Sequence, residues 1–77
     1  MSHTTNANTA YPNILGGIGF YTNTDRKNTP ASADGYIVSF RWHSALYVTQ
    51  LYIDDAHRDV YMRSLTDTWS DWKKLSA

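Results

Sequence analysis

Hydrophobic and polar residues alternate along this 77-residue chain in short runs, with the period of two that is typical of β-strands. The clearest run is YIVSFRWH at 36–43, in which Tyr36, Val38, Phe40 and Trp42 share one face. The residues between them, one of them arginine and one histidine, share the other face. We therefore predict a half-buried strand whose inner face is the aromatic one.

Three further runs predict strands, namely ILGGIGFYT at 14–22, LYVTQLYI at 46–53 and VYMRSL at 60–65. In the first run, Ile18 and Phe20 alternate with glycines, which indicates a strand that is apolar on one side only. The second run carries apolar residues on both sides, and we expect that strand to be covered on both faces.

The remaining segments are polar and rich in turn-forming residues. Residues 1–13 read as a polar N-terminal arm or linker, and residues 14–77 read as a single β domain. A long loop is expected at 23–35 and a polar turn at 54–59. No window of eleven residues keeps a helical period, so the predicted fold is all-β: a small antiparallel meander or sandwich.

The last ten residues, TWSDWKKLSA at 68–77, allow two interpretations. As a helix, Thr68 and Asp71 would resemble a capping box, and Trp69 and Trp72 would share one face. As a strand, the tryptophans would point to opposite faces unless a bulge lay between them. So short a helix is marginal, and we favour the strand. Trp69 is then expected to pack inward and Trp72 to face a neighbouring subunit or the sheet edge.

Composition narrows the possible partners and points to oligomerisation. The chain has no cysteine and is too short to bury a large core, so subunit packing is the expected way to complete it. Seven basic and seven acidic residues cancel, and no basic stripe favours nucleic acid. No apolar run is long enough for a signal peptide or a membrane span. We expect the chain to be the tip of a longer protein.

The order GY…Q…VYMRS…TWSDWKKL resembles the knob domain of bacteriophage and R-type pyocin tail fibres over roughly 14–77. The residues that carry the resemblance are Gly35 and Tyr36 opening a strand, Gln50, Tyr61, Arg63, and the closing W-S-x-W of Trp69, Ser70 and Trp72. The glycine-rich turn usual before W-S is replaced by Leu65-Thr66-Asp67-Thr68.

The resemblance implies a small β module completed by trimerisation in a fibre, at the virion's tail fibre tip. It further implies attachment to the bacterial surface, with a surface polysaccharide or lipopolysaccharide as partner. The alternative is a structural module that trimerises or caps a fibre whose binding or depolymerase site lies upstream. The resemblance supplies no defined binding site.

The densest polar cluster is Asp54, Asp55, His57 and Asp59. Its residue types suit a metal site or an acid–base pair, but the spacing fits neither an EF-hand loop nor a zinc pattern. We favour a solvated turn whose aspartates bond nearby backbone amides. No nucleophile motif occurs either, so we expect no enzyme activity, no metal and no cofactor.

Exposed aromatic rings beside polar side chains are the natural candidates for a saccharide platform. The candidate receptor-binding residues are Trp42, His43, Tyr52, Asp54, Asp55 and His57. The residues expected to be structural are Gln50, Tyr61, Arg63, Trp69 and Trp72. For an arginine within a strand, the expected partner is a carboxylate or an aromatic ring.

Overall fold

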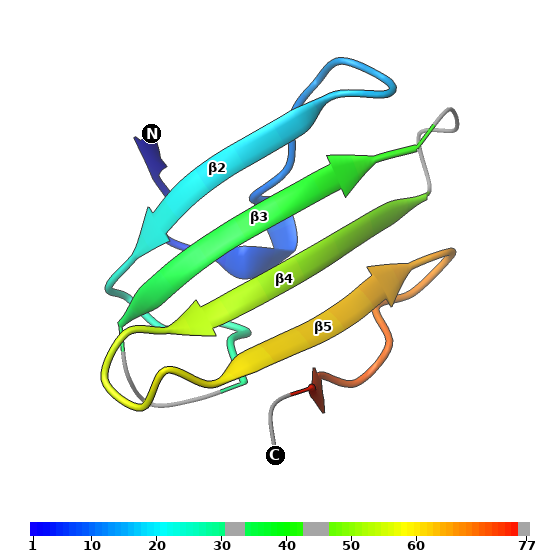
Figure 1. Ribbon diagram of the computed structural model, residues 1–77. Coiled ribbons are helices and arrows are strands. Elements are labelled where there is room, and N and C mark those ends of the chain that lie inside the picture. Colours follow the sequence, from blue (N-terminus) through cyan, green and yellow to red (C-terminus); the bar gives the residue numbers. More distant parts are fainter. Residues whose placement is uncertain (31–33, 43–46, 76–77) are drawn as a thin grey trace.

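The computed structural model describes residues 1–30, 34–42 and 47–75, and their strands form one sheet in the order β1-β2-β3-β4-β5-β6 (Figure 1). The strands are β1 (Ser2–His3), β2 (Ile18–Asn23), β3 (Gly35–Arg41), β4 (Val48–Asp54), β5 (Val60–Leu65) and β6 (Lys73–Lys74). β1 runs parallel to β2, and all other neighbours are antiparallel. The predicted all-β antiparallel meander is confirmed, but the described residues form no second sheet.

The ends of the predicted strands are less regular than their centres. Residues 14–17 form a turn instead of strand, in which the amide of Gly17 donates to the carbonyl of Ile14. Gly16 takes a φ of 78°, a left-handed conformation that glycine adopts without strain. Within the described residues 68–75, β-pairing is limited to the Leu65–Trp69 bridge and to β6, so most of the predicted closing strand is not a strand.

Strand register divides β2 to β5 into two faces of opposite character. On the covered face the most deeply buried side chains are those of Asn23, Ile37, Ser39, Val48, Gln50, Tyr52, Asp54 and Arg63. The other face, called the open face below, carries Ile18, Phe20, Tyr36, Val38, Phe40, Leu51, Ile53, Val60 and Met62. The predicted inner face of 36–42 is therefore wrong: Tyr36 and Phe40 lie on the open side, each 40% exposed.

The N-terminal segment covers the other side of the sheet. Ala7 and Ala10 are buried against Ile37 and Tyr52, and the short 3-10 turn η1 (Ala7–Thr9) lies behind β3 and β4 in Figure 1. The Gln50 side-chain amide donates to the carbonyls of Ala7 at 2.7 Å and Ala10 at 3.0 Å. Residues 4–10, in the segment predicted to be an arm or linker, are therefore packed on the sheet.

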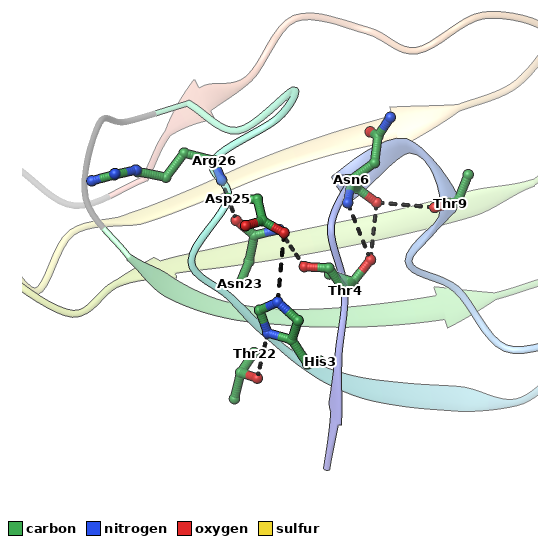
Figure 2. Close-up of polar contacts among 8 residues, drawn as sticks. All are labelled: His3, Thr4, Asn6, Thr9, Thr22, Asn23, Asp25 and Arg26. Carbon is green, nitrogen blue, oxygen red and sulfur yellow. Dashed lines mark hydrogen bonds and ion pairs between the residues drawn. The ribbon is translucent and has the colours of Figure 1, made fainter.

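Polar contacts fix the start of this segment to the end of β2 (Figure 2). Asn23, which is fully buried, donates from its side chain to the carbonyl of Thr4 at 3.0 Å and accepts from the amide of Arg26 at 2.7 Å. His3 lies between the hydroxyl of Thr22 and the carboxylate of Asp25, at 3.4 and 3.6 Å. A single buried asparagine thus joins the arm, β2 and the following loop.

The polar backbone of the covering segment explains why the less apolar face of β3 is the buried one. The covering layer is backbone with two alanines, so its carbonyls need hydrogen-bond donors from the sheet beneath. Ser39 donates to the carbonyl of Ala10, and Gln50 serves two carbonyls, so the buried face is partly polar. The more apolar side of the strand is consequently the one that this chain leaves open.

Candidate functional site

The open face is the largest apolar feature of the sheet. Ile18 and Phe20 of β2 are each 54% exposed, and Met62 of β5 is 37% exposed. Val38 and Leu51 pair with each other in the middle of the face and are half-buried. A contiguous apolar surface over four strands exceeds the scattered hydrophobic residues that are normal on a monomer, and it is typical of an interaction surface.

No charged side chain interrupts this surface within β2 to β5, which the structure describes completely. The polar residues among the apolar ones are Thr22, Thr49 and Ser64, and the last two lie 3.4 Å apart, within hydrogen-bond distance. A neutral surface of this kind meets a copy of itself without opposing like charges. β4 was expected to be covered on both faces; within this chain it is buried on one.

The candidate receptor-binding residues do not form one site. Trp42 is 64% exposed at the end of β3, and its amide donates to the carbonyl of Tyr47 at 2.8 Å. His43 lies outside the described residues. Tyr52 is fully buried in the core, and burial raises the pKa of its hydroxyl, so a receptor-contacting role for Tyr52 is wrong.

The polar cluster at 54–59 is the tight β4–β5 turn. Asp54 is buried, and its carboxylate accepts from the amides of Ala56 at 2.9 Å and His57 at 3.1 Å. Its second oxygen lies 2.9 Å from Nδ1 of His57. The prediction of aspartate bonding to turn amides is confirmed for Asp54. Asp55 and His57 are exposed, so of the two aspartates only Asp55 remains accessible to a partner.

The same contacts make the turn sensitive to acid. The bond from the His57 side chain, followed by that from its amide, lowers the pKa of Asp54. A carboxylate whose folded-state pKa lies below the unfolded value of about 3.9 contributes stability above that pH and loses it as the pH falls through the folded value. We expect Asp54→Asn to lower the denaturant midpoint at pH 7, and the deficit to shrink near pH 3. Asp55→Asn, at an exposed carboxylate, is the matched control; an equal effect of both replacements would contradict this account.

Arg63 organises the second cluster, at the C-terminal edge of the covered face. Its guanidinium carbon lies 3.8 Å from the ring centroid of Trp69 and 4.4 Å from that of Trp72, and the side chain is buried. Nε donates to the Gln50 oxygen and an Nη donates to the Asn8 oxygen, both at 2.9 Å. Burial lowers the pKa of Arg63 to about 10, so it stays protonated at neutral pH.

The two tryptophans therefore lie on the same side, whereas a regular strand would have placed them on opposite faces. Trp72 also packs edge-on against Tyr52 at 6.0 Å, and its indole nitrogen donates to the carbonyl of Asn28 at 2.9 Å. Tyr61 packs against the same core. The structure thus brings Gln50, Tyr61, Arg63, Trp69 and Trp72 together, the five residues that the sequence marked as structural.

A groove of about 280 Å³ adjoins this cluster. Its walls include the partly exposed indoles of Trp69 and Trp72, Arg63, and the polar residues Asn8, Asn28 and Asp71. Asn8 and Asn28 come from segments that sequence reasoning treated as arm and loop. The polar, turn-forming composition of those segments suggested only an arm and a loop, and nothing local marked the two asparagines as neighbours of the tryptophans.

Comparisons with protein families, with curated proteins and with solved structures find no match for this chain. The described residues contain no group of three or more histidine, aspartate or glutamate side chains placed to hold a metal ion. In the described part of the chain there is also no helix of a length and apolarity that would cross a membrane. The structural features that bear on function are the open face and the groove beside Trp69 and Trp72, called the tryptophan groove below.

Proposed function

We propose that this chain is a homotrimeric receptor-binding module of a bacteriophage tail fibre or tailspike, which attaches to glycan on the bacterial surface. The observation that carries the proposal is the neutral apolar open face, which a fibre would bury between its subunits. The resemblance of the closing W-S-x-W and the Tyr-x-Arg strand to tail fibre knobs supplies the trimeric state and the virion as its location.

The size of the open face supports subunit packing. The molecule measures 33 × 24 × 17 Å, so it is a flat body of one sheet and its N-terminal cover, with a broad open side. The two longer Cα extents of the whole molecule enclose roughly 800 Å², which is of the same order as the area that each partner buries in a standard interface. Partners with apolar, uncharged surfaces of this kind are typical of permanent assemblies rather than transient ones.

A second copy is the occupant that this surface fits best. A face with no charged group would offer a charged partner nothing to pair with, whereas an identical face matches it in polarity. Three copies around an axis would each bury their Phe20, Val38 and Leu51 side chains. The half-exposed apolar side chains of the open face would then be buried by the neighbouring subunits.

The alternative function is structural: the module trimerises or caps a fibre whose binding or depolymerase site lies elsewhere. It rests on the same open face and on the burial of Tyr52 and Asp54, which removes two of the candidate receptor contacts. The two functions differ in whether the assembled module attaches to cells by itself.

Light scattering coupled to size exclusion tests the assembly, and we expect a mass of three copies of the 8.8 kDa chain. The same sample, fluorescently labelled, is then mixed with bacterial strains that carry complete or truncated lipopolysaccharide. Attachment to at least one strain, lost on truncation, is the expected result. A monomer at every concentration contradicts the fibre proposal, and a trimer that attaches to no strain favours the structural alternative.

A further inference from the structure

The tryptophan groove lies on the side of the sheet that subunit packing leaves free. Arg63 belongs to the covered face, whereas its strand neighbour Met62 belongs to the open face, because side chains alternate along β5. Oligomerisation through the open face would therefore leave the groove walls of Trp69 and Trp72 accessible to a ligand. The groove is also more polar than the open face, since two asparagines and an aspartate line it.

Two hydrogen-bonding groups at the groove have no partner in the part of the chain that the structure describes. The Asp71 carboxylate makes no hydrogen bond or ion pair there, and Asp71 is exposed. The Asn8 oxygen accepts from Arg63, and among the described residues the Asn8 NH₂ group donates no hydrogen bond. A hydrogen-bond acceptor and a donor among the residues that line a groove with two indole rings match the hydroxyl groups and the apolar C–H face of a sugar ring.

The charge of Arg63, by contrast, is not offered to a ligand. Its guanidinium is stacked between two indoles and bonded to Gln50 and Asn8. The accessible charge at the groove is then the negative Asp71, which disfavours acidic sugars. A volume of about 280 Å³ lies just below the range of roughly 300–1,000 Å³ that is usual for ligand pockets, and it fits about one sugar ring.

We infer that the groove of Trp69, Trp72, Asn8 and Asp71 binds a neutral pyranoside, with the ring's apolar face on an indole and its hydroxyls on Asp71 and Asn8. The inference deepens the proposed function and rests on it for the source of the sugar, a bacterial surface glycan. The inferred receptor contact therefore lies not at Trp42 but at Trp69 and Trp72, two residues for which the sequence predicted a structural role.

Tryptophan emission provides the test, because the chain has three tryptophans and only Trp42 lies outside the groove. In a Trp42→Phe background, emission reports only Trp69 and Trp72. The probes are the methyl glycosides of galactose, glucose and mannose, N-acetylglucosamine, and glucuronic acid as the acidic counterpart of glucose. At least one neutral probe is expected to shift the emission with a dissociation constant on the order of 1–10 mM, and glucuronic acid to bind more weakly.

Asp71→Ala is expected to weaken that binding about tenfold or more, since a charged acceptor is lost. Asp67→Ala, at an exposed carboxylate of the preceding turn, is the matched control and is expected to bind as the parent does. Circular dichroism verifies that both variants fold.

No emission change with any neutral probe, or undiminished binding by Asp71→Ala, overturns the inference. If no neutral probe changes the emission but the protein is trimeric and attaches to cells, the fibre proposal stands and the receptor contact lies elsewhere. Conversely, a monomer that binds a neutral probe through Asp71 supports the groove and contradicts the trimer.

Discussion

Val38→Glu is expected to convert the proposed trimer to monomers while each chain stays folded. Val38 lies in the middle of the open face, between Phe20 of β2 and Leu51 of β4. Three glutamates brought together in an apolar interface would each lose their hydration without gaining a partner. We expect association to weaken by at least about 100-fold, measured by light scattering over a dilution series.

The fold of the monomer should survive because Val38 contributes nothing to the core that Ile37, Tyr52 and the N-terminal alanines form. Met62→Glu, at another position of the open face, is a second variant in case Val38→Glu does not fold. Asn13→Glu adds the same charge at an exposed position outside the sheet and is expected to leave the trimer intact. Trimers that persist in both open-face variants would exclude this face as the subunit interface.

Arg63→Ala is expected to lower the free energy of unfolding by about 3 kcal/mol, equivalent to a melting temperature roughly 15 °C lower. The replacement leaves a gap between the rings of Trp69 and Trp72 and removes the donors to Gln50 and Asn8. Gln50 also donates to the carbonyls of Ala7 and Ala10, so removing Arg63 is expected to weaken the packing of the N-terminal segment as well.

Two controls separate the causes of that loss. Arg63→Lys keeps a positive charge but not the planar group that stacks between the rings, and an intermediate loss is expected. Lys73→Ala removes an exposed cation and is expected to change stability by less than about 0.5 kcal/mol. Guanidinium chloride unfolding at one fixed protein concentration measures all three, since subunit association would itself shift the midpoint. An Arg63→Ala protein as stable as Lys73→Ala would show that the stacked guanidinium is not structural.

Local patterns predicted the strands well because the alternation of apolar and polar residues that marks a strand lies within the strand's own sequence. The run at 60–65 coincides with β5, and the runs at 36–43 and 46–53 differ from β3 and β4 by one or two residues at each end. The Asp54 turn was predictable for the same reason, since an aspartate bonding amides two and three residues later is a local contact. The partner of Arg63 was predicted only in part: an aromatic ring was one of the two expected partners, and contact with two rings was not expected.

The face that is buried could not be read from the hydrophobic pattern. Both sides of β4 contain apolar and hydrogen-bonding residues, and the choice between them depends on what lies above. The cover is the backbone of residues 7–10, which comes from some forty positions earlier in the chain than Gln50. Only contacts of that separation, such as Gln50 to Ala7 and Asn8 to Arg63, define the covered side.

The closing TWSDWKK segment shows the same difference between what local sequence predicts and what long-range contacts decide. Its sequence placed two aromatic residues three positions apart and favoured an extended conformation over a helix. Tertiary structure decided that both rings meet one buried guanidinium, because Arg63 and the isolated Leu65–Trp69 bridge place them together. The sequence by itself thus determined which segments extend and where they turn, since these depend on neighbouring residues. Which face is buried, and which side chains share a groove, depends on segments far apart in the chain, so only the folded structure decided them.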